Sequence, residues 1–120
     1  MNAKELRIGN YVDRTDYICK VTEIKEDGIF TEPLSYKGER LVKQILQPIP
    51  LTEEWLLKLG FKQKNDIEFY EYIKDYFIVE NEYTDKGVWD FVTDDNGMIV
   101  EIKYVHQLQN LYFALTEKEL

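Results

Sequence analysis

Residues 47–61 read QPIPLTEEWLLKLGF and carry the clearest local structural signal in the chain. Thr52 is a good helix N-cap, and the two glutamates that follow it lie in the first turn, where the helix dipole favours negative charge. Gly60 supplies the left-handed position at which many helices end. The stretch therefore predicts a short helix over about 53–59. Its buried stripe is expected to consist of Trp55, Leu56 and Leu59.

The two prolines of this stretch, Pro48 and Pro50, restrict the backbone and stop a helix from running through them, so they mark a joint. Before the joint, β-branched residues and a hairpin signal at Asp27-Gly28 favour short strands. Gly9 and Val12 open this part in a Gly-x-x-Val pattern. Together these features predict a small SH3-like β-barrel or a β-meander. The expected strands span residues 6–12, 17–25, 29–31 and 40–46.

After the helix, hydrophobic residues follow a period of two from Ile67 to Ile102, which is typical of strands. Lys74-Asp75 and Asn96-Gly97 are tight-turn signals, and a further turn is expected at residues 85–87. The segment therefore predicts a four-stranded antiparallel meander. A final helix is expected over residues 104–114, with a broad apolar face. Its opposite, polar side is expected to show His106, Gln107 and Asn110.

The predicted fold class is therefore α+β. Residues 1–50 are expected to form a β-rich SH3-like subdomain. Residues 51–120 are expected to form a subdomain of helix, four-stranded meander and helix, with the helices covering one face of the sheet. The two parts are expected to pack as one compact unit.

Composition restricts the class of protein. The chain has 120 residues, 14% of them aromatic, which supports a folded domain. No stretch approaches the roughly 20 apolar residues of a membrane-spanning helix, and the first residues lack the apolar core of a signal peptide. A lone cysteine, Cys19, permits no intrachain disulfide and suits a reducing compartment. These features predict a cytoplasmic protein with no membrane partner.

Charge is segregated along the chain. The net charge is −8, yet residues 1–50 carry eight acidic and eight basic residues, so the whole excess lies in residues 51–120. The predicted meander holds ten acidic residues against Lys74 and Lys86. Three interpretations remain open: a solvated face kept soluble by charge, a docking surface for a basic partner, or paired carboxylates for catalysis. The docking interpretation names Glu80, Glu82, Tyr83 and Asp90 as binding residues.

Catalytic residues are scarce. His106, Cys19 and Ser35 are the only residues of their types, so a Ser-His or Cys-His site would have to use His106. Cys19 lies in an apolar strand pattern and Ser35 in a turn pattern, and neither context suits a nucleophile. No zinc, EF-hand or phosphate-loop pattern is present. The chain is therefore expected to be no enzyme and to need neither cofactor nor metal.

His106 leaves two interpretations open. It could be the general base of a hydrolase, with Gln107 and Asn110 beside it on the last helix. The other interpretation is a surface or subunit-contact histidine, which then belongs to a binding surface together with the same two residues.

Three segments, ELRIGNYV (5–12), QPIPLTEEWLLKLGF (47–61) and KYVHQLQNLYFALT (103–116), resemble a family of small uncharacterised proteins of Bacteroides-like bacteria and of their phages and prophages. The resemblance spans both ends of the chain. It implies a bacterial or phage cytoplasmic accessory protein that acts in host interaction or defence modulation. It assigns no residue a role.

These observations favour a protein-interaction module that contacts a protein partner, or a second copy of itself, through the acidic sheet or the last helix. The alternative is a nucleic-acid-binding protein that uses basic residues of the N-terminal strands. Those residues are Arg7, Arg14, Lys20, Lys25, Arg40 and Lys43.

Overall fold

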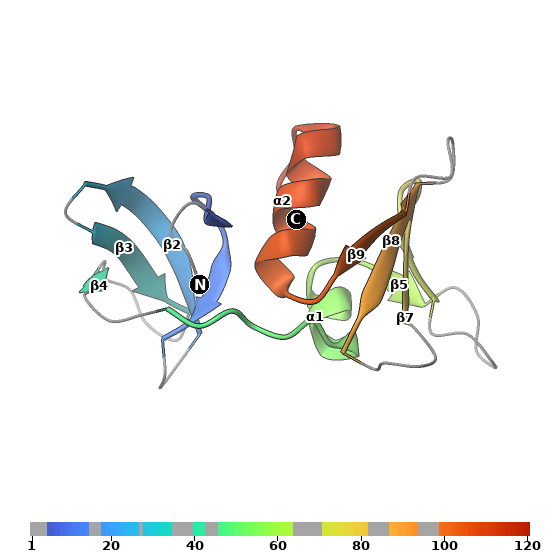
Figure 1. The fold of residues 1–120 in the computed structure, drawn as a ribbon, viewed down its shortest axis with the longest axis horizontal. Coiled ribbons are helices and arrows are strands. Elements are labelled where there is room, and N and C mark those ends of the chain that lie inside the picture. Colours follow the sequence, from blue (N-terminus) through green and yellow to red (C-terminus); the bar gives the residue numbers. More distant parts are fainter. Residues whose placement is uncertain are drawn as a thin grey trace. The chain divides into compact units, whose positions relative to one another are not determined.

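The structure, a computed structural model, describes residues 5–14, 18–26, 28–34, 40–42, 46–63, 71–81, 87–93 and 99–120, with only the backbone described for 40–42. The chain is α+β, with two antiparallel sheets and two helices (Figure 1). It divides into two compact units. Unit 1 contains the residues up to Ile49 together with Tyr104–Glu119, and unit 2 contains Pro50–Lys103.

The chain crosses from one unit to the other twice, near residue 50 and near residue 103. Within each unit, a backbone hydrogen bond links the residue next to the first crossing with the residue next to the second. In unit 1 the Val105 N–H donates to the Ile49 carbonyl at 2.9 Å. In unit 2 the Leu51 N–H donates to the Lys103 carbonyl at 2.9 Å. The predicted joint at residues 47–50 therefore coincides with a boundary between the units.

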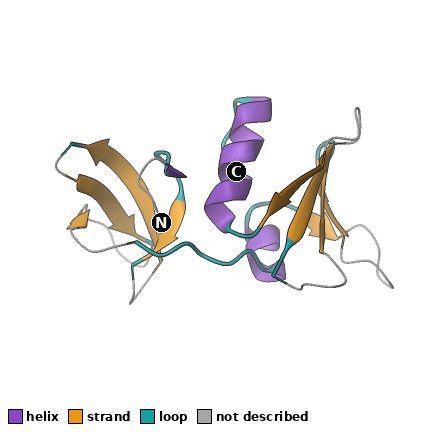
Figure 2. Cartoon of the chain, viewed as in Figure 1, coloured by secondary structure: helices purple, strands orange, loops and turns teal. Residues whose placement is uncertain are grey.

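Unit 1 contains an antiparallel sheet, whose strands are among those drawn in orange in Figure 2. The sheet has four strands in the order β1-β2-β3-β4. Leu6, Val12, Cys19, Val21 and Leu46 form its buried cluster. Lys25 pairs with Gly28, so the two-residue turn lies one position earlier than the turn expected at Asp27-Gly28; Asp27 itself lies outside the described residues. The strands are β1 (Tyr11–Asp13), β2 (Ile18–Lys25), β3 (Gly28–Pro33) and β4 (Arg40–Val42).

Two expectations for unit 1 are corrected. The described strands form an open antiparallel meander with β1 and β4 at its edges, which is one of the two predicted alternatives, and they do not close into the other, an SH3-like barrel. The first strand also begins later than residue 6, because a turn precedes it. The Arg7 N–H donates to Asn10 Oδ1 at 2.7 Å, the Asn10 N–H donates to the Arg7 carbonyl at 3.0 Å, and Gly9 takes a φ of +98°. A side chain that binds nearby backbone in this way competes with strand formation.

Helix α1 (Glu53–Lys58) confirms the predicted helix and both of its ends. Thr52 Oγ1 accepts a hydrogen bond from the Trp55 N–H at 3.3 Å. At the other end the Phe61 N–H donates to the Leu56 carbonyl at 2.9 Å and the Gly60 N–H to the Leu57 carbonyl at 3.1 Å. This is the Schellman pattern, which needs a residue at positive φ, and Gly60 has a φ of +95°.

Unit 2 contains a five-stranded antiparallel sheet in which the strands follow their order in the chain. This corrects the predicted four-stranded meander, because Lys62–Gln63, just after α1, pairs with the next strand and adds a fifth. Lys74 pairs with Phe77 across a two-residue turn, one position later than the turn expected at Lys74-Asp75. The signals at 85–86 and at Asn96-Gly97 lie outside the described residues. The strands are β5 (Lys62–Gln63), β6 (Glu71–Lys74), β7 (Phe77–Asn81), β8 (Trp89–Thr93) and β9 (Ile99–Ile102).

One face of this sheet is packed with the α1 segment. Trp89 Nε1 donates to the Leu51 carbonyl at 3.1 Å, and Lys74 Nζ donates to the Leu59 carbonyl at 3.0 Å. Burial of each large side chain contributes about 1.5–3 kcal/mol, so this packing is the main stabilising interaction of unit 2. Its core members include Leu51, Leu56, Leu59, Phe61, Tyr72, Val79, Val88, Trp89, Phe91 and Ile102.

Helix α2 (Val105–Thr116) begins and ends within two residues of the predicted helix, but it belongs to unit 1. The predicted division into residues 1–50 and 51–120 therefore differs from the observed one in the placement of α2. Among its described residues, unit 2 has α1 but no second helix beside its sheet. The membership of α2 in unit 1 has a physical reason. The side-chain amides of Gln109 and Asn110 hydrogen-bond to the segment before β1 and to its first residue.

Substitution of Gly60 by alanine tests the end of α1. The alanine would have to adopt the positive φ of Gly60, and its Cβ would lie 2.8 Å from Lys74 Nζ. The hydrogen bond from Lys74 to the Leu59 carbonyl would therefore have to shift. We expect the free energy of unfolding to fall by about 1–2 kcal/mol. Urea denaturation followed by tryptophan fluorescence measures it, since both tryptophans, Trp55 and Trp89, lie in unit 2.

Leu57→Ala is the matched control, because Leu57 is an exposed position of the same helix. It should leave the unfolding midpoint nearly unchanged. Equal stability of Gly60→Ala and the wild type would contradict the assigned helix end.

Candidate functional site

A single row of carboxylates crosses the sheet of unit 2. The register pairs Glu71 with Glu80, Glu80 with Asp90, and Asp90 with Glu101, on four successive strands from β6 to β9. Directly opposed residues point to the same face, with Cβ atoms about 4.5–5.5 Å apart. These four residues are called the acidic row. Two of the residues predicted to bind a partner, Glu80 and Asp90, are adjacent members of it.

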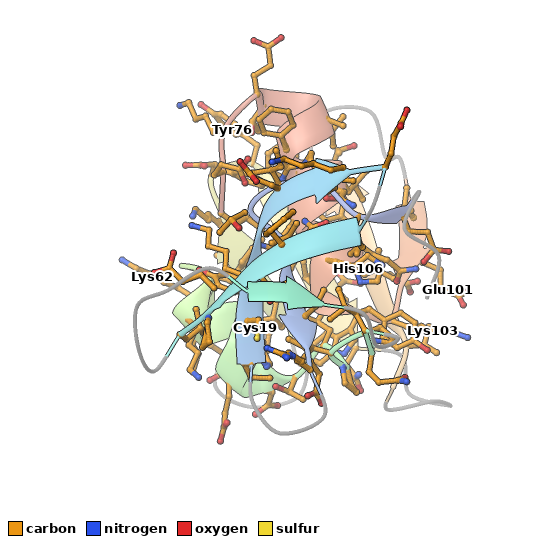
Figure 3. The ribbon with its side chains drawn as sticks, turned by 90° about the vertical axis from the view of Figure 1, so that its left-hand side faces the viewer. Cys19, Lys62, Tyr76, Glu101, Lys103 and His106 are labelled. Carbon is orange, nitrogen blue, oxygen red and sulfur yellow. The ribbon has the colours of Figure 1, made fainter. Side chains whose placement is uncertain are left out.

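An aliphatic row lies beside the acidic row on the same face, because residues two apart along a strand share a face. The register aligns Ile73 with Ile78, Ile78 with Val92, and Val92 with Ile99. Ile78 is only 8% exposed, whereas Ile99 is 66% exposed. The apolar row is therefore accessible chiefly at its β9 end, next to Asp90 and the exposed Glu101 (Figure 3).

This face is the one turned away from the core of unit 2. The alternate residues Val79 and Phe91 are fully buried and belong to the opposite face, which carries Trp89 and Lys74 and thereby faces the α1 segment. Strand geometry fixes this separation, since a one-residue shift of register would exchange the two faces. The acidic and aliphatic rows together are called the outer face.

The remaining sheet residues predicted to bind a partner do not join this surface among the described residues. Glu82 and Tyr83 lie outside the described part of the chain. Tyr72 is buried in the core, where it packs edge-on against Trp89. Tyr76 is exposed in the turn between β6 and β7 (Figure 3).

His106 is not on an exposed side of α2, contrary to the sequence-based expectation. Its side chain, labelled in Figure 3, is buried, with 2% of the residue exposed. Gln107 is exposed and caps the helix, because its Oε1 accepts from the Tyr104 N–H at 3.1 Å. Asn110 is half-buried, and its Oδ1 accepts from Asn10 Nδ2 at 2.8 Å while its Nδ2 donates to the Glu5 carbonyl at 2.9 Å.

The buried side of α2 is mainly apolar but includes the polar residue Gln109, which replaces a missing strand partner. Gln109 Oε1 accepts from the Tyr11 N–H at 2.8 Å, and Gln109 Nε2 donates to the Gly9 carbonyl at 3.0 Å. One side-chain amide thus satisfies a donor and an acceptor of the backbone, as a neighbouring strand would. Together with Asn110 and Asn10 these contacts are called the α2–loop network.

His106 lies at the margin of this network. Its Nε2 is 3.8 Å from Glu5 Oε2, its ring stacks on Tyr104 at 6.0 Å, and its Nδ1 has no hydrogen-bond partner among the described residues. Burial lowers the pKa of the imidazole, and the nearby Glu5 carboxylate offsets only part of that effect. The imidazole is therefore neutral at neutral pH, and its burial argues against a role in contacting a partner or a dissolved substrate.

Cys19 is fully buried in the cluster of unit 1. Burial raises the pKa of its thiol, which holds the sulfur in the protonated, weakly nucleophilic form. The residue therefore serves as a small apolar filler of the core.

The basic residues of the N-terminal strands have been placed in part. Arg7 contacts α2, and Lys25 Nζ lies 3.1 Å from Glu23 Oε2 and 5.0 Å over the Phe30 ring. Lys20 is exposed on β2. The side chain of Arg40 and all of Lys43 lie outside the described part. The nucleic-acid alternative thus has Arg7 and Lys25 already engaged within the chain.

Within the described ranges, no group of three His, Cys, Asp or Glu side chains is arranged to hold a metal ion. No described helix has the length and apolarity to cross a membrane. Comparison of the chain with protein-family models, with curated proteins and with solved structures finds no match.

Sequence reasoning did not find Gln109, Asn10 or Glu119 as members of a site. Their partners lie about a hundred residues away along the chain, and no periodicity within one segment carries that information. The one available signal was the placement of three amides, Gln107, Gln109 and Asn110, on a helix that otherwise has an apolar face.

The pKa of His106 predicts a pH dependence of stability. The unfolded chain protonates this histidine near the ordinary pKa of about 6.5, whereas the folded state resists protonation. The unfolded state therefore binds more protons, and stability is lost as pH falls through that value. A single histidine allows NMR titration of its Hε1 signal, for which we expect a midpoint below the ordinary value. His106→Leu should flatten the dependence of stability on pH between 7.5 and about 5.5, and an unchanged slope would contradict it.

Asp90→Asn tests the electrostatics of the acidic row. Asp90 is opposed by Glu80 on one side and Glu101 on the other, and directly opposed like charges are destabilising. We expect the free energy of unfolding to rise by about 0.2–1 kcal/mol at low salt, and the gain to shrink as salt screens the charges. Chemical denaturation measures it, with the exposed Glu54→Gln as control. A destabilised Asp90→Asn would show that the row is favourable to the fold.

Proposed function

We propose that the protein is a protein-interaction module that binds a basic, amphipathic segment of a partner protein through the outer face. The acidic row is the observation that carries this proposal. Its four carboxylates lie opposed on neighbouring strands of one sheet face, so the row concentrates negative charge along a line. A surface that concentrates one sign of charge attracts and orients a partner of the opposite sign.

The chemistry of the outer face supports a partner that carries both basic and apolar side chains. Neighbouring strands are about 4.8 Å apart, so the row presents carboxylates at short, regular intervals, which suits several arginine or lysine side chains at once. The exposed Ile99 and the half-exposed Val92 lie next to Asp90 and Glu101 and offer apolar contact area. A partner that alternates basic and apolar side chains would satisfy both rows.

A homodimer through this same surface is disfavoured. A two-fold interface places the same patch of both copies face to face, and this would oppose carboxylate to carboxylate. A heterologous basic partner, such as a protein that normally binds nucleic acid, carries the complementary charge.

The proposed setting is the cytoplasm of a bacterium. The resemblance of three segments to small proteins of Bacteroides-like bacteria and their phages supports an accessory protein directed at a host factor or a defence component. The net charge of −8, concentrated in the second half of the chain, supports rapid electrostatic association with a basic partner.

A peptide-binding titration tests the proposal. The probe is a short peptide of alternating arginine and valine, measured by calorimetry against the full chain at low and moderate salt. We expect Asp90→Lys/Glu101→Lys to weaken binding by about tenfold or more, because attraction is replaced by repulsion. Glu26→Lys/Glu54→Lys changes the net charge equally at exposed positions off the outer face and should retain most of the affinity.

One further variant and one further peptide test the apolar part of the surface. Ile99→Ser removes the exposed apolar contact and should weaken the valine-containing peptide more than an arginine–serine peptide. Equal loss of affinity in both charge-reversal pairs would indicate nonspecific attraction and would refute the outer face as the binding surface.

A further inference from the structure

Arg7 in unit 1 is held in place by the neighbouring Ile8 carbonyl and by groups of α2. Its Nε donates to Asn110 Oδ1 at 3.3 Å, and its terminal nitrogens contact the Ile8 carbonyl at 3.2 Å and the Gln109 carbonyl at 3.5 Å. The guanidinium carbon lies 4.1 Å from the centre of the Phe113 ring, a cation–π arrangement. Four groups other than a carboxylate thus contact the Arg7 side chain.

The outward edge of this guanidinium binds the Glu119 carboxylate through both of its oxygens. Nη2 donates to Oε2 at 3.0 Å, and Nη1 contacts Oε1. Paired contacts of this kind match the planar fork of arginine to a carboxylate. The surrounding groups leave room for the anion, because Gly9 has no side chain and a Cβ there would lie 3.3 Å from Glu119 Oε2.

Glu119 reaches this position by a sharp turn after α2. Glu117 adopts the left-handed conformation with a φ of +62°, and its N–H donates to the Phe113 carbonyl at 2.7 Å. The Lys118 N–H then donates to Thr116 Oγ1 at 3.1 Å. The Glu119 side chain is 50% exposed, whereas that of Arg7 is 26% exposed. The occupant is therefore more accessible to solvent than the group that binds it.

We propose that Arg7, Gly9 and Phe113 form a carboxylate-binding site for an acidic side chain of a partner polypeptide, and that Glu119 occupies this site within the chain. A solvent-exposed ion pair contributes little to stability, so a carboxylate from outside can exchange with Glu119. While Glu119 is bound, only the vacant fraction of molecules can accept the partner. The segment after α2 thus acts as an internal competitor.

This site is independent of the outer face. It lies in unit 1 and selects negative charge, whereas the acidic row lies in unit 2 and selects positive charge. The two proposals can consequently fail separately.

NMR titration of the full chain tests the site through the Arg7 Nε–Hε signal. The probe is a blocked Ala-Glu-Ala peptide, and Ala-Gln-Ala is the matched neutral probe. Glu119→Gln removes the internal competitor. If Glu119 leaves the site vacant in about one molecule in ten, this variant should bind the glutamyl peptide about tenfold more tightly than the wild type. The glutaminyl peptide should bind neither protein.

Arg7→Lys in the Glu119→Gln background keeps the charge but removes the planar fork, and it should abolish the gain. Retained amide signals of Gly9 and Tyr11 verify that the loop is intact. If that double variant does not fold, the comparison of Glu119→Gln with the wild type decides by itself. An equal affinity of these two proteins for Ala-Glu-Ala, or equal binding of both peptides, overturns the proposal. Tighter binding of inorganic phosphate than of the glutamyl peptide overturns the assignment to carboxylates.

Discussion

Gln109 acts in unit 1 as a neighbouring strand would. Its amide accepts from the Tyr11 N–H and donates to the Gly9 carbonyl, so one side chain of α2 satisfies the backbone just where β1 begins. Loss of either bond would leave a buried polar group unpaired, at a cost of about 1–3 kcal/mol. This constraint ties the end of the described chain to its beginning and explains why α2 belongs to unit 1 and not to the meander that precedes it.

The same constraint organises the surroundings of Arg7. Asn110, one residue after Gln109, accepts from both Asn10 and Arg7, and this orients the guanidinium toward Glu119. Adjacent residues of α2 thus bind the backbone at the start of β1 and orient Arg7. His106 also serves the fold, since it is buried against Tyr104 and near Glu5.

Unit 2 separates stability from surface chemistry by strand alternation. The face toward α1 contains the core, including Trp89 and Phe91, and the other face carries the acidic row. Alternation allows four carboxylates to line up without entering the core. The buried face supplies the stabilisation of unit 2, so the outer face can carry charged side chains.

Local chemistry in the sequence was sufficient for α1, for its caps at Thr52 and Gly60, and for the α+β class, because these depend on neighbouring residues. It was also sufficient to identify Glu80 and Asp90 as members of an acidic sheet. Only the tertiary structure placed them in one row with Glu71 and Glu101, since strand register depends on pairing between distant segments. It likewise decided that His106 is buried and that α2 joins unit 1. Hydrogen bonds between residues about a hundred positions apart fixed the placement of α2, and these leave no periodic trace in the sequence.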